Sequence, residues 1–277
     1  MVGGLDPAFF FQTKEELSAR ELVLITLNYG IYCSPVATSF NRAGPSCAPG
    51  VSGKSLITKK TKFRRTEYFE LTLGEPMGTG AVGTVHLAKV TILLEEGDTL
   101  KHDVIVKLAS SKHQKAKILN EYNVYAHLRK AKNVQCIVPV YGLFQDPESR
   151  AVALVMEHGG RNLRYLNEEE PERENKVLGE ERYVLSREEK IIWMFTDRGW
   201  STRERYIAAL KSLHKAGVHH GDIRPDNILF NRERKVIIDF DCAVYRRSDL
   251  NYEKNRNEIR RLQAVFDGDY VDGIWVS

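Results

Sequence analysis

Cysteine is scarce in this chain, and its spacing suits neither a metal site nor a disulfide framework. The 277 residues contain four cysteines with no C-x-x-C pair, so neither zinc ligation nor a set of disulfides is indicated. Thiols scattered in this way favour a reducing, intracellular compartment.

Long apolar segments and strong charge are also missing. The longest apolar run, Leu22–Leu27, is far shorter than the roughly 20 residues that a membrane-spanning helix needs, and the first residues lack the basic-then-apolar layout of a signal peptide. A net charge of +4 is too small to indicate nucleic acid. These absences predict a soluble cytoplasmic protein that binds neither membrane nor nucleic acid.

The first 65 residues differ in composition from the rest. A capping-box pattern at Thr13–Glu16, followed by apolar residues as far as Ile25, predicts one short amphipathic helix. Residues Tyr32–Ser55 are rich in Ser, Pro, Gly and Ala, which predicts a flexible linker. The basic cluster Lys59–Arg65 offers nuclear import as an alternative to a solvated linker end. Residues 1–65 are therefore expected to be a flexible N-terminal extension.

An ordered region with a glycine-rich loop is expected from Tyr68 onward. Tyr68–Leu73 and His86–Leu94 have the composition of strands, and G-T-G-A-V-G-T-V (Gly78–Val85) joins them. Glycines allow backbone N–H groups to approach phosphate oxygens closely. Because the segment after the loop is β-branched and apolar, the loop joins two strands, whereas a dinucleotide-binding loop leads into a helix.

Lys107 lies within the apolar strand Asp103–Ala109, where an unpaired ammonium group would be costly. The following segment, Lys115–Lys130, has apolar residues at helical spacing with Glu121 alongside them. We expect an ion pair between Lys107 and Glu121 that fixes the lysine for binding nucleotide phosphates. A solvated surface carboxylate is the alternative for Glu121.

The stretch Val218–Asp241 concentrates polar groups at strand ends. Asp222 precedes Asn227 by five residues, and a short charged turn and an apolar strand then lead to Asp239. Two carboxylates and an amide suit Mg²⁺, which takes oxygen ligands and leaves room for phosphate. One carboxylate would then be left to orient a hydroxyl or a water. The alternative is a polar turn between a buried helix and a hairpin.

Taken together, these motifs resemble the protein-kinase superfamily. G-x-G-x-x-G-x-V, a strand lysine, a helix glutamate, H-x-D-x-x-x-x-N and D-F-x follow one another between about Tyr68 and Asp267. The resemblance implies an α+β, two-lobed kinase-like fold. Residues 66–160 would form an N-lobe with a five-stranded antiparallel sheet and one helix. Residues 161–277 would form a mostly helical, truncated C-lobe with an acidic insertion near 165–190.

The resemblance also implies ATP and Mg²⁺ as cofactors and assigns roles in the C-lobe. Asp222 would accept or orient the proton of the acceptor hydroxyl, and Asn227 and Asp239 would bind Mg²⁺. Arg224 would lie near the γ-phosphate, with a geometry different from that of lysine. His220 would hold the loop in place and would not act as a base.

In the N-lobe, Lys107 would bind the α- and β-phosphates and Glu121 would position it. Ile105 stands where kinases usually have a small alanine over the adenine ring, a departure that bears on the size of the adenine pocket. Besides Lys107, the resemblance implies these nucleotide-binding residues: Gly78, Thr79, Gly80, Ala81, Gly83, Val85, Met156, Glu157 and His158.

Several departures from the usual kinase pattern are informative. Gly221 replaces the arginine of H-R-D, and Asp241 replaces the glycine of D-F-G. Only 36 residues follow Asp241, and they contain no A-P-E. In these respects the chain is similar to small atypical kinases, to aminoglycoside and choline phosphotransferases, and to short fungal-type kinase-like proteins. A helix is expected at Asn257–Phe266, with Ile259, Leu262 and Phe266 buried under this chain or under a protein partner.

Three functions are therefore open at the level of sequence. The leading hypothesis is an ATP-dependent kinase that acts on Ser/Thr hydroxyls of a protein substrate. A pseudokinase or truncated ATP-binding scaffold is one alternative, favoured by the missing A-P-E. A small-molecule kinase of the aminoglycoside or choline phosphotransferase type is the other. Retention of Lys107, Asp222, Asn227 and Asp239 favours turnover.

Overall fold

The computed structural model describes residues 7–27, 37–49, 62–131, 133–163, 202–230, 235–245, 252–267, 270–271 and 274–275. The chain divides into two compact units. The N-unit comprises residues 1–130 and 138–158, and the C-unit comprises residues 131–137 and 159–277. The acidic insertion expected near 165–190 lies outside the described residues.

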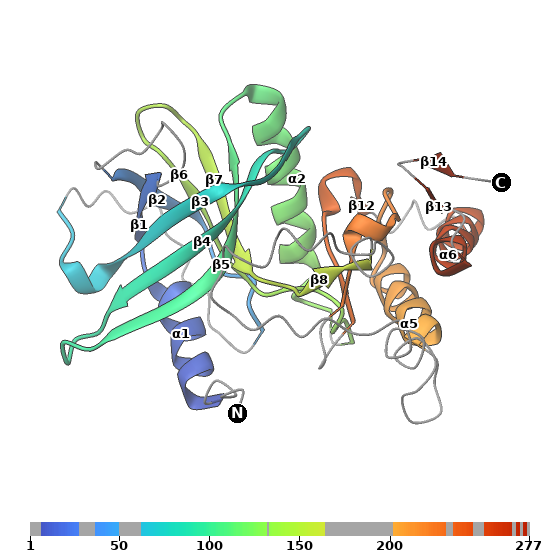
Figure 1. Ribbon diagram of the computed structural model, residues 1–277, viewed down its shortest axis with the longest axis horizontal. Helices are drawn as coiled ribbons and strands as arrows, with labels where there is room; N and C mark the ends of the chain where they lie inside the picture. The colour runs from blue at the N-terminus through green and yellow to red at the C-terminus, as the bar shows by residue number, and fades with distance from the viewer. Residues whose placement is uncertain are drawn as a thin grey trace, which may run out of the picture. The chain divides into compact units, whose positions relative to one another are not determined.

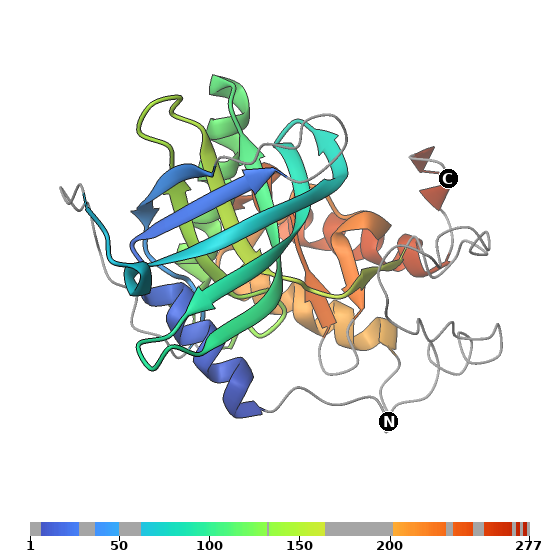
Figure 2. The same cartoon turned by 60° about the vertical axis from the view of Figure 1, so that its left-hand side comes forward.

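The N-unit is built on a closed barrel with the strand order β1-β2-β6-β7-β5-β4-β3 (Figures 1 and 2). Neighbouring strands of the barrel are antiparallel, except that β1 and β3 pair in parallel. Side chains alternate along the strands, and those on the inner face fill the core, where Phe69 and Phe144 meet edge to face at 5.6 Å. The strands are β1 Leu22–Leu27, β2 Thr38–Gly44, β3 Tyr68–Gly80, β4 Gly83–Leu93, β5 Thr99–Ala109, β6 Val140–Gln145 and β7 Val152–Glu157.

The expectation of a five-stranded antiparallel sheet is therefore wrong. Strands β3, β4 and β5 overlap the three segments for which the sequence predicts strands, but β1 and β2 join β3 to β7 and close the sheet. Leu22, Leu24 and Ile25 are expected to belong to a helix, yet Leu22–Leu27 forms strand β1, with Val23 and Ile25 in the core. A short apolar run satisfies either periodicity, and here pairing with β3 decides the conformation.

The expectation of a flexible linker at Tyr32–Ser55 is also wrong over its described part, residues 37–49. Strand β2 lies there, and Ala48 beyond it is fully buried. The small residues reflect close packing, because a Cβ placed on Gly44 would lie 2.6 Å from the ring of Tyr122.

Helix α1, Pro7–Ala19, lies against the barrel and begins earlier than the predicted capping box at Thr13–Glu16. Arg42 of β2 joins this helix to the sheet. Its guanidinium group donates to the backbone carbonyls of Arg20, Leu17 and Tyr141 at 2.6, 2.8 and 2.9 Å. Only 3% of Arg42 is exposed, and burial lowers its pKa to about 10.

Helix α2, Lys112–Leu128, packs on the outside of the barrel against β5, β6 and β7. Ser111 caps it in a capping box, in which the Ser111 hydroxyl accepts from the Gln114 amide and the Gln114 side chain accepts from the Ser111 amide. The Tyr122 hydroxyl donates to the Pro45 carbonyl at 2.9 Å. The segment after β2 is thus tied to the helix that carries Glu121.

The C-unit contains helices α5, Thr202–Lys215, and α6, Tyr252–Asp267, which pack against each other. The rings of Tyr206 and Phe266 lie 5.5 Å apart at their contact. In the part of the C-unit that the structure describes, three short sheets accompany the helices. One consists of β8 Arg161–Asn162, β10 Ile228–Phe230 and β11 Lys235–Ile237. The others pair β9 Val218–His219 with β12 Val244–Tyr245, and β13 Tyr270–Val271 with β14 Ile274–Trp275.

The predicted buried face of α6 is partly wrong. Leu262 is fully buried, but Ile259 and Phe266 are only half-buried, and Glu258 and Val265 are buried beside Leu262. Among the residues described above, none of the helices has the length and apolar character to span a membrane.

Candidate active site

The glycine-rich loop is a tight hairpin. Strands β3 and β4 remain paired as far as Gly80 and Gly83, so that two residues form the turn. Gly83 has φ +116°, and a Cβ there would lie 2.1 Å from the Leu108 carbonyl oxygen, so packing requires glycine at this position. A Cβ on Gly78 or Gly80 would meet no atom within 4 Å. Their open backbone fits a surface that phosphate oxygens approach.

The ion pair expected between Lys107 of β5 and Glu121 of α2 is present. Lys107 Nζ donates to both carboxylate oxygens of Glu121, at 2.9 and 2.8 Å. The side chains are 7% and 0% exposed. The carboxylate therefore fixes the ammonium group in a buried position with little freedom to move.

Lys107 lies on the outer face of the sheet, between strands β4 and β7. Val85 lies opposite Lys107 in the register, and Ile105 lies between Leu87 and Met156. Residues opposite each other in antiparallel strands share a face. The structure therefore brings Val85 and Met156 onto the face that carries Lys107, with the larger Ile105 side chain among them.

Glu157 and His158 end the N-unit. The Glu157 amide donates to the Pro139 carbonyl at 2.9 Å, and its buried carboxylate accepts from the Tyr141 hydroxyl at 3.4 Å. The Glu157 N–H is thus engaged within the N-unit, whereas His158 is exposed.

In the C-unit, one loop holds the predicted catalytic acid. Asn227 Nδ2 donates to the Asp222 carbonyl at 2.8 Å and to its Oδ2 at 3.0 Å. Arg224 Nε lies 3.2 Å from the same Oδ2, and the Asp222 side chain is 34% exposed. Arg224 thus forms an ion pair with the acid, and two side chains of the loop orient a carboxylate that solvent reaches.

The β10–β11 hairpin brings Asp239 close to Asn227. Ile228 pairs with Ile237 across β10 and β11, and the Ile238 amide donates to the Asn227 carbonyl at 3.0 Å. Asp239 follows directly with φ +70°, a backbone region that non-glycine residues rarely occupy and that is found at functional sites. The hairpin therefore presents Asn227 and Asp239 at the same end.

His220 holds the loop from below, as expected. Its ring is fully buried, packs 5.0 Å from the Phe240 ring, and places Nε2 2.8 Å from the Ile238 carbonyl. Its Nδ1 accepts from the Asp222 amide at 3.2 Å. Burial lowers the pKa of His220. The ring is therefore neutral and structural, with a proton on Nε2.

A hydrogen bond between Gly221 and Glu258, which the sequence did not predict, anchors the backbone of this loop. Gly221 has φ +83°, and a Cβ there would lie 2.6 Å from the Cys242 carbonyl oxygen, so this backbone excludes arginine. The Gly221 amide donates to Glu258 Oε1 at 2.6 Å. Burial acts to raise the pKa of Glu258, but hydrogen bonds from His214 and from backbone amides bring it below its usual value. In the sequence, the spacing of Glu258 from Leu262 by one helical turn could have predicted that the Glu258 carboxylate is buried on the same face of α6.

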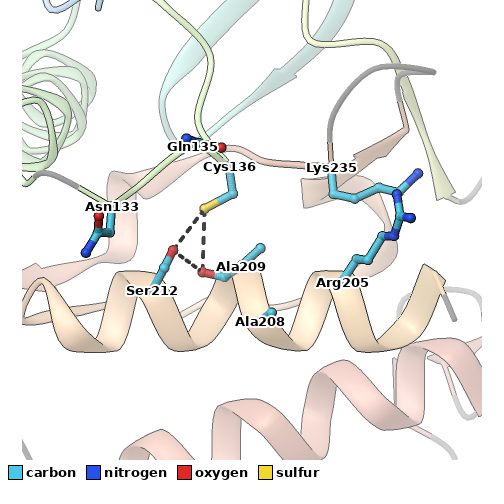
Figure 3. A pocket seen from close by; sticks show the side chains of 8 residues that line it. All are labelled: Asn133, Gln135, Cys136, Arg205, Ala208, Ala209, Ser212 and Lys235. Carbon is cyan, nitrogen blue, oxygen red and sulfur yellow. Dashed lines mark hydrogen bonds between the residues drawn. The ribbon is translucent and has the colours of Figure 1, made fainter. Parts of the chain in front are cut away.

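A pocket of about 320 Å³ in the C-unit contains none of the predicted site residues (Figure 3). Cys136 lies 3.5 Å from the Ala209 carbonyl oxygen and 3.7 Å from the Ser212 hydroxyl in this pocket. Burial raises the pKa of the Cys136 thiol to about 11, so the thiol is protonated and unreactive at neutral pH.

Comparison with known proteins agrees with this geometry. The family model described as protein kinase domain matches residues 71–258, a span that includes every predicted site residue. The chain therefore belongs to the protein kinase domain family.

Individual relatives are distant. A putative serine/threonine-protein kinase, L268, of Acanthamoeba polyphaga mimivirus is 22% identical over 77% of this chain and 36% of its own length. The serine/threonine-protein kinase ppk35 of Schizosaccharomyces pombe is 25% identical over 66% of this chain and 24% of its own length. The Aurora kinase of the same yeast is 31% identical over 62% of this chain and 41% of its own length. The chain thus spans less than half the length of these relatives.

Proposed function

We propose that this protein is a kinase that transfers the γ-phosphate of Mg·ATP to a serine or threonine hydroxyl of a protein substrate. The observation that carries the proposal is the Asp222 carboxylate, which is accessible to solvent and held by Asn227 and Arg224. A general base must be both oriented and reachable by the acceptor. The serine/threonine kinases among the relatives support the acceptor class.

The residues present fit the cofactors. Both Asn227 hydrogen bonds to Asp222 use Nδ2, which leaves the amide oxygen of Asn227 to join a carboxylate oxygen of Asp239 as a ligand. This all-oxygen donor set suits Mg²⁺. In the N-unit, Lys107 would bind nucleotide phosphates beneath the open Gly78–Gly83 hairpin. Bound Mg·ATP would supply the phosphoryl group and neutralise the charge that develops during its transfer.

The chain's own residues would act mainly by positioning. Asn227 and Arg224 both bind Oδ2 of Asp222, so Oδ1 is the oxygen that would accept the hydroxyl proton. His220 and Glu258 fix the backbone on either side of Gly221 and thereby hold Asp222 in place. Because no arginine precedes Asp222, activity should not depend on phosphorylation of the segment that follows Asp239.

Nucleotide binding is tested by thermal denaturation with Mg·ATP. A one-site ligand at 100 times its Kd stabilises the folded state by about 2.7 kcal/mol, which raises the Tm of a chain this long by roughly 5 °C. We expect such a rise for the wild type and a much smaller one for Asp239→Ala. A wild type that Mg·ATP does not stabilise would rule out both kinase assignments.

Transfer is tested with radiolabelled ATP on generic protein substrates and on aminoglycosides and choline. We expect labelled phosphoserine or phosphothreonine. Label on the small molecules alone would assign the chain to the small-molecule phosphotransferases.

An ATP-binding scaffold is the second candidate. The Ile105 side chain reduces the space for an adenine ring beside Met156, and only six residues, with no A-P-E motif, separate β12 from α6. Binding of Mg·ATP without transfer to any acceptor would favour this role. We also propose a cytoplasmic location, with the nucleus as the alternative, and a protein partner that covers part of the C-unit. Microscopy and affinity purification of the tagged chain test both.

A further inference from the structure

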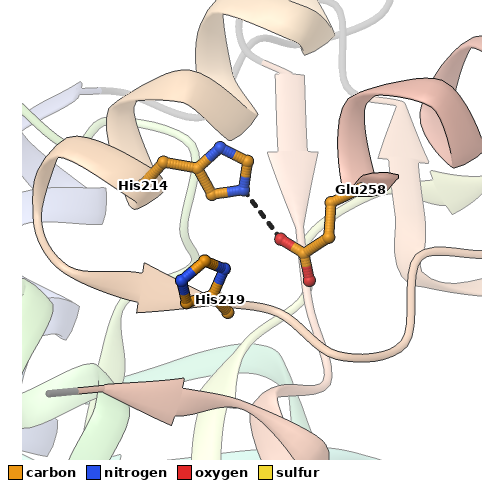
Figure 4. Close-up of side chains that lie close together, drawn as sticks. All are labelled: His214, His219 and Glu258. Atoms are coloured by element: carbon orange, nitrogen blue, oxygen red, sulfur yellow. Dashed lines mark hydrogen bonds and ion pairs between the residues drawn. The ribbon is translucent and has the colours of Figure 1, made fainter. Parts of the chain in front are cut away.

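Three buried side chains of the C-unit converge outside the proposed magnesium site (Figure 4). We call them the His214 cluster. His214 lies in the last turn of α5, His219 in β9 and Glu258 in α6. They are 6%, 6% and 8% exposed, and each offers one ligand atom within 4.8 Å of the other two.

The cluster already has part of the geometry of a metal site. His214 Nε2 lies 2.7 Å from Glu258 Oε2, and the His219 ring lies 5.6 Å from that of His214 between centroids, tilted by 39°. The other carboxylate oxygen, Oε1, accepts from the Gly221 amide at 2.6 Å. A backbone donor that holds the second oxygen of a carboxylate is the kind of outer-shell contact that orients metal ligands.

We propose that His214, His219 and Glu258 bind a divalent transition-metal ion of the zinc type. Two imidazoles and a carboxylate are a known zinc donor set that leaves one coordination position open. The metal would take the place of the hydrogen between Nε2 and Oε2, and the neutral His214 ring would carry its proton on Nδ1. Ligand atoms around tetrahedral zinc lie about 3.4 Å apart. The ligand atoms now lie within 4.8 Å of one another, so the widest pair would close by at most about 1.4 Å, and His214 Nε2 and Glu258 Oε2 would move apart by about 0.7 Å from 2.7 Å.

The donor chemistry separates this cluster from the magnesium site. Imidazole nitrogens suit zinc, cobalt and nickel, whereas Mg²⁺ prefers the all-oxygen set offered by Asn227 and Asp239. A metal held by α5, β9 and α6 would cross-link three elements of the C-unit. Through Oε1 of Glu258 it would also rigidify the backbone next to Asp222.

The test uses the 277-residue chain, stripped of metal with a chelator and free of nucleotide. It carries Asp239→Asn, which weakens the magnesium site. Co²⁺ is the spectroscopic probe, with Zn²⁺ as competitor. We expect one equivalent of Co²⁺ to give the visible absorption of a tetrahedral nitrogen and oxygen site, and one equivalent of Zn²⁺ to displace it. Zn²⁺ should also raise the Tm.

His219→Gln is the decisive variant, because it removes a ligand and leaves the bond between His214 and Glu258 intact. It should weaken Zn²⁺ binding by more than about 100-fold, since the loss of an outer-shell partner alone costs 10- to 100-fold. The exposed His113→Gln is the matched control and should bind like the wild type. Circular dichroism confirms that each variant is folded. Equal affinity in His219→Gln, or no saturation at one equivalent, would overturn the proposal and leave a hydrogen-bonded cluster without metal.

Discussion

The buried pair between Lys107 and Glu121 supports the most quantitative prediction. Both carboxylate oxygens lie within 2.9 Å of Nζ, and the two side chains are almost completely buried. Removing one partner leaves a buried charge without compensation, which destabilises a protein by about 3–5 kcal/mol. We therefore expect Glu121→Leu and Lys107→Met each to lower the free energy of unfolding by that amount.

The double variant should behave differently from the sum of the single ones. Replacing a buried ion pair with apolar residues of similar volume is often neutral or stabilising by about 1–4 kcal/mol. Lys107→Met/Glu121→Leu should therefore unfold at a urea concentration close to that of the wild type or higher, while losing nucleotide binding. This outcome would show that the pair serves phosphate binding and not stability.

Urea denaturation followed by circular dichroism measures all four proteins of this cycle. Lys89→Met is the control, because Lys89 is an exposed lysine of the neighbouring strand β4 and should change stability by less than about 0.5 kcal/mol. Additive single effects, with a coupling energy near zero, would refute the reasoning, since they would mean that the two charges do not interact in solution.

The remaining predictions concern other parts of the chain. Arg42→Met should lower the free energy of unfolding by at least about 3 kcal/mol in urea, because it leaves several buried carbonyls without donors. Gly221→Ala should lower it by about 1–3 kcal/mol, since the position has φ +83° and lies against Cys242. Ile105→Ala should tighten ATP binding by roughly threefold to tenfold in calorimetry by enlarging the adenine face. Because the pKa of His220 is lowered in the folded state, the unfolded state takes up a proton on this ring at a higher pH than the folded state does. The free energy of unfolding should therefore fall by up to about 1.4 kcal/mol per pH unit below pH 6.5. His220→Gln should reduce that slope.

The parts of the fold that could be predicted are those with regular local patterns. Apolar residues alternate along β3 and β5 and recur at helical spacing in α2, and an isolated lysine in an apolar strand required a partner such as Glu121. Strands β1 and β2 could not be predicted, because a short apolar run fits both periodicities and the Gly44 region looks like a linker. Only their neighbours in the barrel determine their conformation.

The candidate site divides in the same way. The order and spacing of its motifs predicted that Asp222, Asn227 and Asp239 lie close together, and in the structure they lie at adjoining loop and strand ends. Their catalytic and metal-binding roles stay predictions. The anchoring of Gly221 by Glu258 could not be predicted, because it joins residues 37 positions apart through one side chain. No local pattern reports such a contact.

The central claim is that Asp222 is the base of a phosphoryl-transfer site, and its most direct test is a single-turnover measurement of phosphate transfer. Asp222→Asn should retain Mg·ATP binding and lose transfer by about 10²- to 10⁴-fold, the usual contribution of a general base. Asp226→Asn, the same change in the same loop, is the matched control and should retain most of the wild-type rate. Equal loss in both variants, or transfer that survives in Asp222→Asn, would contradict the account.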